Sequence, residues 1–376
     1  MKKFFALLLS LTMILALTAC GGSKSEDTTP ADSDTQEPAS DFKVGFITLH
    51  DENSTYDLNF INAAKAACEK LGVEYTLITN VPEGQECYDK AAELADAGCN
   101  IIFADSFGHE DYMIQAAKEF PHVQFCHSTG TKAHTEGLDN YHNTFASIYE
   151  GRYLAGIAAG MKLNEMIDSG KITADQAKIG YVGAFTYAEV ISGYTSFFLG
   201  ARSVCPSASM EVTFTGSWYD ETAGVPNVSY NGSTESVGPN TYIVSSRIDW
   251  EPYYEYAITA AMNGDPIDTD WTGTLATGSV VLTDLNANVA AEGTQEAIDA
   301  AKAELEAGTR QVFDVTTFTV DGQQVESYQA DVDTDANYTP DTEVVENGAF
   351  QESKFRSAPY FDLRIDGITL LDEAYG

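Results

Sequence analysis

The distribution of hydrophobic and polar residues along the chain predicts alternating strands and helices. Residues 43–49 form a short apolar run suited to a buried strand, and residues 57–71 follow with helical spacing that stops before Gly72, a typical helix C-cap. Four strands separated by helices of 10–15 residues predict β-α-β units and a right-handed, doubly wound parallel sheet. The remaining elements expected in this part are strands at 73–78, 100–104 and 123–127 and helices at 85–97 and 110–120.

A second cycle of the same kind follows a long helix rich in Ala and Gly, expected over residues 145–166. Two similar α/β lobes would face each other across a cleft at the carboxyl ends of their strands and close by a hinge. The elements expected in the second cycle are strands at 178–183, 210–215, 225–230, 241–245 and 280–283 and helices at 189–204, 253–263 and 294–307.

These elements divide the folded part of the chain into three segments. We assign residues 42–145 to a first lobe and 146–310 to a second lobe, with crossings between them near 145–150 and 245–255. Residues 311–376 are polar and β-prone, with turn signals at two Xaa-Gly pairs, and we expect them to form a β-rich C-terminal extension.

The second cycle is shorter than the first at one point. In the first lobe 44 residues lie between Ile78 and Val123, whereas nine residues separate Thr215 from Val225. A helix, a strand and a second helix do not fit there, since one crossover with its helix needs at least about 10–12 residues. Either the lobe is naturally simplified, with a tight connection through residues 219–223, or about 35 residues have been deleted. We favour the deletion, which would cost the second sheet a central strand and reduce stability or ligand binding.

The first twenty residues have the pattern of a secretory signal. A positively charged start precedes an apolar run over residues 4–17, which is too short for a transmembrane helix of about 20 residues. The sequence ending at Cys20 resembles a bacterial lipobox, in which the cysteine is acylated and becomes the mature N-terminus. We therefore expect a signal peptide over 1–19, a lipid anchor at Cys20, and a disordered tether over 20–41 that is too polar to form a core.

Composition narrows the possible partners. The chain has 57 acidic and 20 basic residues, for a formal net charge of −37. A surface this acidic repels phosphate backbones, so we expect no nucleic-acid partner. The cysteines after Cys20 show no spacing typical of a metal site, and we expect them to be buried small hydrophobic residues, with no metal and no cofactor. They are Cys68, Cys87, Cys99, Cys126 and Cys205.

Several short motifs occur together along the two cycles. They are the strand and loop at 43–57, the helix sequence at 149–156, the strand at 179–183, the helix end at 199–204 and Gly-Ser-Trp-Tyr-Asp at 216–220. In combination they resemble the basic membrane protein family of ABC-transporter solute-binding lipoproteins, whose better-known members bind purine nucleosides. The resemblance covers roughly residues 43–308. The family continues after the last motif with helix, strand and helix, so any ligand contact from that segment is absent here.

The resemblance implies a fold, a location and a partner. The fold would be a type I periplasmic-binding-protein-like α/β fold of two lobes, with the second lobe truncated. The protein would be a monomer, lipid-anchored at the outer face of the cell membrane, and it would dock on an ABC permease in that membrane. Its ligand would be a small molecule of the purine nucleoside class.

The candidate ligand contacts lie just past the carboxyl ends of the predicted strands. A nucleoside needs aromatic faces for its base and a few polar groups for its ring nitrogens and hydroxyls. Each candidate also has a structural alternative, namely helix capping, strand-end capping or core packing. The candidates are Asn53, Tyr56, Asp57, Asp105 and Phe107 on the first lobe and Phe185, Trp218, Asp249 and Trp250 on the second.

The sequence contains no motif of a known catalytic site. The cluster at 109–111 lacks the His-Glu-x-x-His spacing of a zinc protease, and neither a Gly-x-Ser-x-Gly elbow nor a Walker motif occurs. We therefore predict an extracytoplasmic binding protein that delivers its ligand to an ABC importer, and not an enzyme. Two alternatives stay open: a surface sensor or antigen of the same fold without transport, and a member whose binding the deletion has weakened.

Overall fold

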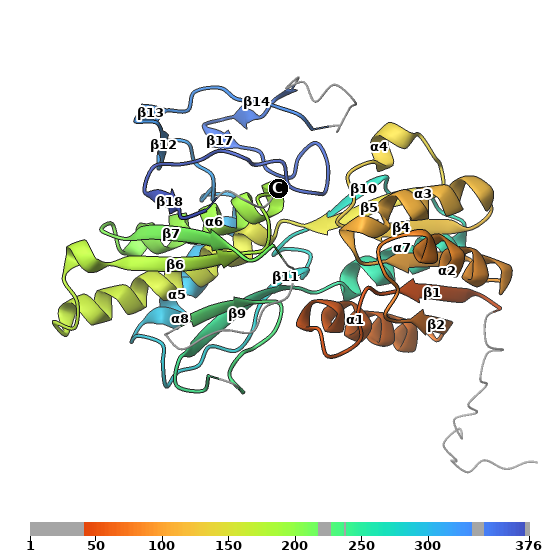
Figure 1. The fold of residues 1–376 in the computed structure, drawn as a ribbon, viewed down its shortest axis with the longest axis horizontal. Helices are drawn as coiled ribbons and strands as arrows, with labels where there is room; N and C mark the ends of the chain where they lie inside the picture. Colours follow the sequence, from red (N-terminus) through yellow and green to blue (C-terminus); the bar gives the residue numbers. More distant parts are fainter. Residues whose placement is uncertain (1–40, 217–226, 237, 333–341, 373–376) are drawn as a thin grey trace, which may run out of the picture. The chain divides into compact units, whose positions relative to one another are not determined.

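The structure is a computed structural model that describes residues 41–216, 227–236, 238–332 and 342–372. Its largest sheet has the strand order β10-β5-β4-β3-β1-β2, and all neighbouring strands in it are parallel (Figure 1). This sheet contains the four strands predicted for the first lobe and two more. The strands are β1 (Lys43–Ile47), β2 (Glu74–Ile78), β3 (Ile101–Ala104), β4 (Gln124–Ser128), β5 (Tyr141–Ala146) and β10 (Asp270–Gly273).

Helices cover both faces of this sheet, so the central strand β3 is apolar and buried at every position and does not alternate. Phe46 and Phe103 point to one face, where they join the side chains of α1 and α7. Ile47 and Ile102 point to the other face, where α2 and α3 pack. The bounds are α1 (Thr55–Leu71), α2 (Gln85–Asp96), α3 (Glu110–Glu119), α4 (Ala133–Glu136), α7 (Glu251–Asn263) and the 3-10 turn η1 (Phe107–His109).

Local sequence determines where helix α1 begins and ends. The Ser54 hydroxyl accepts a hydrogen bond from the Asp57 amide at 3.3 Å, which is the usual side-chain N-cap. Gly72 adopts φ +65° and ends the helix, as its position in the sequence predicted. The helix expected from residue 145 instead begins at Ile148, because residues 145 and 146 pair with β10 as part of β5.

The second part of the chain forms two three-stranded sheets, where a single doubly wound sheet was expected. One has the order β18-β7-β6 and is parallel, and the other has the order β11-β9-β8, with β11 antiparallel to β9. The strands are β6 (Lys178–Gly183), β7 (Ser209–Phe214), β8 (Asn227–Tyr230), β9 (Tyr242–Ile248), β11 (Val280–Leu282) and β18 (Ile368–Leu370).

The division into two sheets has a simple topological reason. By chain order β6 and β7 correspond to β1 and β2, and in the first sheet β1 also pairs with β3. Within the described residues no strand takes the place of β3 between β6 and β8. Val182 on β6 is consequently 64% exposed, whereas four of the five β1 residues are buried. The connection proposed through residues 219–223 lies outside the described residues.

Two long helices pack tightly beside these sheets because glycines line their contact. They are α5 (Ile148–Asp168) and α6 (Ala188–Val204), and the further helices of this part are η2 (Ala174–Gln176) and α8 (Thr294–Glu306). A Cβ placed on Gly156 would lie 2.0 Å from the carbonyl oxygen of Phe197, and one on Gly200 would lie 2.0 Å from that of Tyr153. The backbones therefore approach more closely than any side chain would allow.

Some segments join sheets that are distant from them in sequence. Helix α7 and strand β10 fall within the range 146–310 assigned to the second lobe, yet they pack on the first sheet. Strand β18 falls within the C-terminal extension 311–376, yet it extends the sheet of β6 and β7. The chain therefore crosses between the sheets more often than the two predicted crossings, and the assignment of three segments remains a proposal.

The rest of the C-terminal segment is built from short ladders around an aromatic cluster. Phe313 stacks on Phe361 with ring centroids 4.3 Å apart, and Phe350 meets Phe361 edge-on at 4.7 Å. The ladders pair β12 (Thr319–Val320) with β13 (Gln323–Gln324), β14 (Gln329–Ala330) with β15 (Thr342–Glu343), and β16 (Val345–Glu346) with β17 (Ala349–Phe350).

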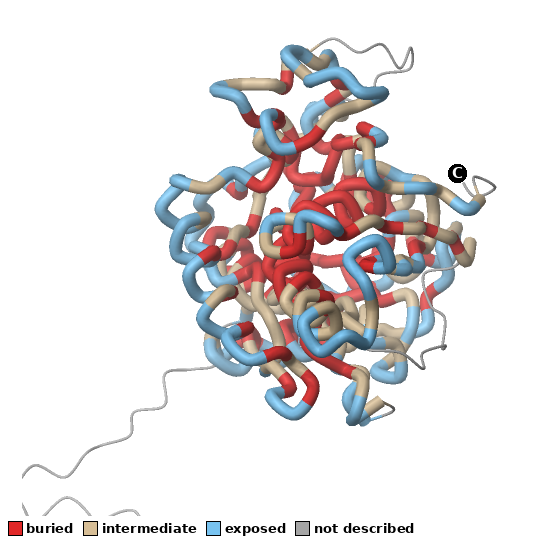
Figure 2. The backbone as a smooth tube through the Cα atoms, turned by 90° about the vertical axis from the view of Figure 1, so that its left-hand side faces the viewer, coloured by how far each residue is buried: buried red, intermediate tan, exposed pale blue. Residues whose placement is uncertain are grey.

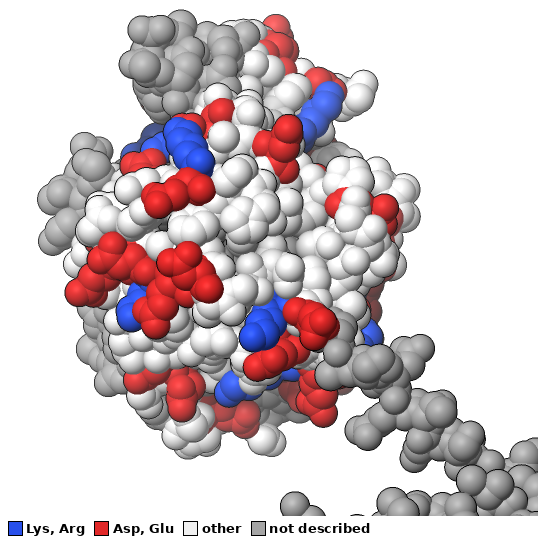
Figure 3. Space-filling view, turned by 90° about the vertical axis from the view of Figure 1, so that its right-hand side faces the viewer, with Lys and Arg blue, Asp and Glu red and all other residues white. Residues whose placement is uncertain are grey.

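The positions of buried residues, charged residues and cysteines agree with the expectations drawn from the composition. Buried positions gather in the interior of the described chain, with exposed positions along the outer loops and helices (Figure 2). Acidic side chains are spread over the face shown in Figure 3, with fewer basic ones among them. All five cysteines of the described residues are free and buried, which confirms the expectation. None of the described helices combines the length and apolar character needed to cross a membrane.

Candidate functional site

The carboxyl end of β3 carries a buried acid. Asp105 is 1% exposed, and its Oδ1 accepts a hydrogen bond from the Leu49 amide at 3.1 Å. Its Oδ2 accepts no hydrogen bond, and the Asp57 carboxyl lies within side-chain hydrogen-bonding reach of the Asp105 carboxyl. Tyr56, in the first turn of α1, donates its hydroxyl hydrogen to the Asp105 carbonyl oxygen at 2.8 Å. The structure therefore brings together two of the predicted contacts, Tyr56 and Asp105, at the ends of neighbouring strands.

The electrostatic environment of this acid favours its neutral form. Burial raises the pKa of the Asp105 carboxyl well above its usual range, and the nearby Asp57 carboxylate raises it further. Burial also raises the pKa of the Tyr56 phenol, with contributions from Asp105 and from Glu189 on α6. Acidic groups from both parts of the molecule therefore contribute to the raised pKa of Tyr56.

Two other predicted residues of the first lobe, Asp57 and Asn53, make hydrogen bonds within the loop that carries them. Asp57 is fully buried and accepts hydrogen bonds from the His50 amide at 2.8 Å and from the Ser54 hydroxyl at 2.5 Å. Asn53 is exposed and donates its side-chain amide to Asp51 at 2.8 Å. Both side chains hold the turn between β1 and α1 in shape, and neither presents a buried unpartnered atom.

Aromatic rings from the ends of β3 and β6 stack on one another. Phe107, 46% exposed, lies 5.9 Å from Tyr187 with an angle of 28° between the rings. Tyr187 in turn stacks on Phe185 at 5.2 Å and 21°. The predicted residues Phe107 and Phe185 thus belong to one aromatic stack that links the loops after β3 and β6.

The remaining predicted residues have other positions. Trp250 is 2% exposed and stacks on Phe60 at 4.5 Å, within the core beneath the first sheet. Asp249 accepts a hydrogen bond from the Glu251 amide at 3.1 Å and pairs with Arg247 at 3.4 Å, so it stabilises the start of α7. Trp218 lies outside the described residues, as does Cys20.

A buried polar cluster of the second part was not predicted as a contact. Arg152 on α5 donates from Nη1 to the Tyr181 hydroxyl at 2.8 Å, and its guanidinium carbon lies 3.9 Å from the ring centre of Tyr230. Its Nε has no hydrogen-bond partner. One signal in the sequence could have revealed it, because Arg152 is the only basic residue between 148 and 161, and Glu150 is the only other charged residue in that stretch of helix.

The turn after β8 contacts α1 directly. Asn59 donates its side-chain amide to the Asn231 side-chain oxygen at 2.9 Å. Gly232 lies so close to Thr55 that an added Cβ would be 2.8 Å from its Cγ2. Both contacts join the start of α1, beside Tyr56, to the carboxyl end of a strand in the second part.

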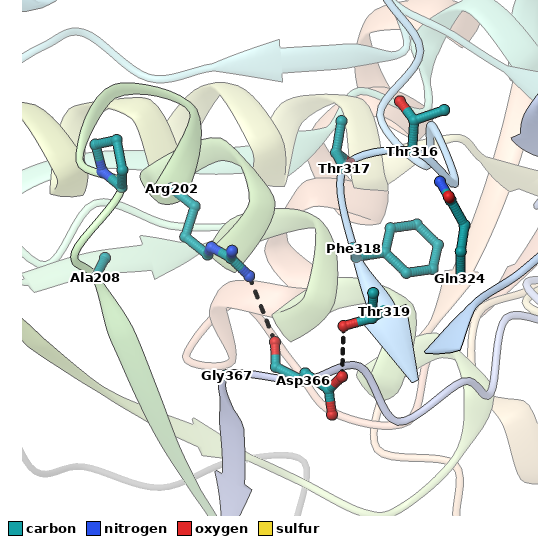
Figure 4. Close-up of a pocket in the computed structure, with 10 residues that line it drawn as sticks. Arg202, Ala208, Thr316, Thr317, Phe318, Thr319, Gln324, Asp366 and Gly367 are labelled. Carbon is teal, nitrogen blue, oxygen red and sulfur yellow. Dashed lines mark hydrogen bonds between the residues drawn. The ribbon is translucent and has the colours of Figure 1, made fainter. Parts of the chain in front are cut away.

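A surface hollow lies at a different place. It has a volume of about 400 Å³ and lies between the end of α6 and the C-terminal segment (Figure 4). Arg202 donates to the Asp366 carbonyl oxygen at 3.4 Å, and Thr319 donates to the Asp366 carboxylate. Its polar groups thus pair with one another, none of the predicted ligand contacts lines it, and we do not place the site there.

The described residues offer no side-chain cluster suited to a metal ion. They contain no group of three or more His, Cys, Asp or Glu side chains that could hold a metal ion. The arrangement can instead provide hydrogen bonds and aromatic surface to a small molecule, through the buried polar groups of Asp105 and Arg152 and the exposed ring of Phe107.

Comparison with known families gives one match. Residues 47–229 match the family described as ABC transporter substrate-binding protein, PnrA-like.

Curated relatives and a solved structure agree with this match. A purine-binding protein of Brucella abortus is 37% identical over 183 residues, 47% of each chain. A glucose-binding protein assigned to an ABC transporter of Haloferax volcanii is 28% identical over 255 residues, 59% of this chain and 60% of the relative. The chain thus spans between about half and three fifths of the length of these relatives. A solute-binding protein of an ABC transporter system from Conexibacter woesei superposes with a TM-score of 0.58 at 18% identity, over 72% of this chain and 98% of that chain, and confirms the predicted α/β fold.

Proposed function

We propose that this chain, which belongs to the PnrA-like family of ABC transporter substrate-binding proteins, binds a purine nucleoside and delivers it to an ABC importer. The family consists of binding proteins, so the prediction that the chain is not an enzyme is confirmed. The nucleoside and the delivery step are our proposals.

One observation carries the choice of ligand. The buried carboxyl of Asp105 lies two residues before Phe107, whose exposed ring begins the aromatic stack. Stacking surface beside a few fixed polar groups suits a flat, polar heterocycle better than a sugar alone. The relative from Brucella abortus is a purine-binding protein, which supports the same ligand class.

Capture would use the contacts between the start of α1 and the turn after β8. Parallel-stranded lobes bind ligands at the carboxyl ends of their strands, and closure brings residues of both lobes onto the ligand. The Asn59–Asn231 hydrogen bond and the close approach of Gly232 to Thr55 show that the two parts already meet beside Tyr56.

We further propose that the protein acts at the outer face of the cytoplasmic membrane. Removal of residues 1–19 and acylation of Cys20 would anchor it there, and the polar tether to residue 41 would leave the folded part free to dock on a permease. The Cys20→Ser variant would then appear in the medium or the soluble fraction. Retention of that variant in the membrane pellet would contradict lipid anchoring.

Isothermal titration with adenosine, inosine, guanosine and glucose tests the ligand class. We expect heat of binding with at least one nucleoside and none with glucose. The Phe107→Ala variant should weaken nucleoside binding roughly tenfold, because a base–aromatic stack contributes about 1–3 kcal/mol. Tyr75→Ala is the matched control, since Tyr75 is 38% exposed and lies on β2, away from the site. Binding of glucose alone would refute the nucleoside proposal.

A further inference from the structure

One carboxylate holds both sides of the residue that carries the exposed ring of the first lobe. Glu83 lies in the loop between β2 and α2, and its Oε1 accepts a hydrogen bond from the Ser106 hydroxyl at 2.5 Å. The same oxygen accepts from the Gly108 backbone amide at 2.9 Å. These two donors are the residues directly before and after Phe107, so a single acceptor spans the turn at that position.

A glycine provides the space in which this carboxylate lies. A Cβ placed on Gly108 would be 2.5 Å from Cδ of Glu83 and 2.8 Å from its Cβ. Gly108 does not adopt a positive φ, so the turn uses the room that glycine leaves and not its conformational freedom. The side chain of Glu83 can therefore lie directly against the turn, where both hydrogen bonds form.

The two ends of the same turn are bonded to the body of the first lobe. The Ser106 carbonyl oxygen accepts from Nε2 of His127, on β4, at 2.7 Å. His109 donates from its Nε2 to the Val81 carbonyl oxygen at 2.9 Å. Both histidines are buried, so the backbone on either side of Phe107 is held by groups that cannot readily move away.

A fixed backbone is important here because the ring itself is only partly supported. Phe107 is 46% exposed, and its ring stacks on that of Tyr187, the residue before α6, at 5.9 Å. A half-exposed ring presents a defined face to a ligand only where its backbone is held in place. Contact surface that is ordered in advance also loses less conformational freedom when the ligand binds.

We infer that Glu83 is a positioning residue for ligand binding, which holds the turn so that the ring of Phe107 meets the base. The inference rests on the proposed function and adds to it a residue that acts without touching the ligand. The alternative is that Glu83 only stabilises the fold, as charge-assisted hydrogen bonds to backbone amides commonly do. The two roles differ in one respect, because a positioning residue affects binding only while Phe107 is present.

A double-mutant cycle tests this dependence, with isothermal titration of whichever of adenosine, inosine and guanosine binds most tightly. Glu83→Ala should weaken binding about fivefold, because the ring remains but is no longer held. In the Phe107→Ala background the same change should cost less than about twofold, since the two residues act as one unit. Glu83→Gln keeps an oxygen that can accept both hydrogen bonds, and its affinity should stay within about twofold of that of the unaltered protein.

Asp314 provides a matched control. Its Oδ1 also accepts from one backbone amide and one hydroxyl, both of Thr316, at 2.9 and 2.7 Å, but it lies in the C-terminal segment. Asp314→Ala removes the same pair of hydrogen bonds and should leave nucleoside affinity unchanged. Circular dichroism melts establish that each variant is folded. If Glu83→Ala is not, Ser106→Ala takes its place in the cycle and should weaken binding about threefold, because one of the two bonds is lost.

The possible failures are distinguishable. Unchanged affinity in Glu83→Ala, or an equal loss with and without the Phe107 ring, would overturn the positioning role and leave the proposed function standing. A fivefold loss in Glu83→Gln or in Asp314→Ala would also overturn it, because the turn keeps its acceptor in both. Absence of binding to every nucleoside would overturn the proposed function, and the positioning role with it.

Discussion

The side-chain amide of Asn59 on α1 donates a 2.9 Å hydrogen bond to the side-chain oxygen of Asn231, 172 residues away and just past the end of β8. This bond ties the start of the helix that carries Tyr56 to the second part of the chain. Next to it, Gly232 approaches Thr55 so closely that no side chain fits between them. The same turn is held from its own side, since the Ser245 hydroxyl donates to the Gly232 carbonyl at 2.7 Å.

Closure should therefore be sensitive to a single methyl group at position 232. In Gly232→Ala, the new Cβ would lie 2.8 Å from Thr55 Cγ2, so the two parts must separate slightly and nucleoside affinity should fall about fivefold or more. Titration calorimetry measures the loss. The double variant with Thr55→Gly should recover most of the affinity, and failure of that rescue would show that the contact does not govern closure.

The crossing of α5 and α6 should tolerate no Cβ at position 156. The Gly156→Ala side chain would lie 2.0 Å from the Phe197 carbonyl oxygen, which is backbone and cannot move aside easily. We expect a loss of about 3 kcal/mol in the free energy of unfolding, measured by urea denaturation. Gly180→Ala is the control, because nothing lies within 4 Å of that Cβ, and a similar loss there would contradict the steric explanation.

Stability should fall with acid because His109 is buried as the neutral form. Burial lowers the pKa of His109 from 6.5 to about 4, and its Nε2 lies 2.9 Å from the Val81 carbonyl. The unfolded chain takes up the proton below pH 6.5 while the folded chain does not, so this stabilisation is complete above pH 6.5 and is lost as the pH falls towards 4. We expect a loss of about 3 kcal/mol from this residue over that window.

Urea titrations at pH 7.5, 5.5 and 4.5 measure this effect. His109→Gln lacks a titrating ring and should show a shallower decline over the same interval. An identical pH dependence in the variant would rule out His109 as a source of acid sensitivity.

Glu352 should give the free energy of unfolding a pH dependence opposite to that from His109, so that stability falls as the pH rises. Burial raises the pKa of the Glu352 carboxyl to about 7, despite the hydrogen bonds donated by the hydroxyls of Ser192 and Ser353. The folded chain therefore holds a proton that the unfolded chain releases above pH 4.5, so this contribution to stability is present below pH 4.5 and is lost as the pH rises through 7.

Replacing the Glu352 carboxyl with an amide should remove the free-energy cost of ionising a buried carboxyl at high pH. Glu352→Gln should raise the free energy of unfolding by about 3 kcal/mol at pH 8 and change it little at pH 4.5, as urea denaturation at the two values would show. Lower stability of the variant at pH 8 would mean that the ionised carboxyl is well solvated or paired.

Within the described residues β6 pairs only with β7, and we expect that adding the strand that chain order places between β6 and β8 would stabilise the protein. A version with a helix–strand–helix segment of about 35 residues inserted after β7 should bury Val182 and unfold at a higher temperature. Equal thermal midpoints and equal ligand affinities for the two versions would defeat the hypothesis of a deletion.

Part of this arrangement could be predicted from local sequence. Gly72, which ends α1, acts within a few residues and was predicted from the sequence as a helix C-cap. The Ser54 N-cap is just as local, but it was not predicted. Asp105 was identified as a candidate because it directly follows an apolar strand, and strands of a parallel sheet end at one edge. Its approach to the Asp57 carboxyl was not predictable, because that depends on how separate loops pack in the folded chain.

Contacts that span long stretches of chain were missed for the same reason. Trp250 looked like a ligand contact after β9, but packing against Phe60, 190 residues earlier, places it in the core. The sequence placed Arg152 on a helix, but its hydrogen bond to Tyr181 and its contact with the ring of Tyr230 arise only on folding.

The sequence by itself determined the alternation of strands and helices, the shortened second cycle and the absence of known catalytic motifs, since periodicity, spacing and turn residues act locally. Only the tertiary structure decided that β10 joins the first sheet, that β18 joins the sheet of β6 and β7, and that the guanidinium of Arg152 lies buried against Tyr181 and Tyr230. Strand pairing and burial are set by contacts between distant segments, and a local pattern cannot specify which distant surface will cover it.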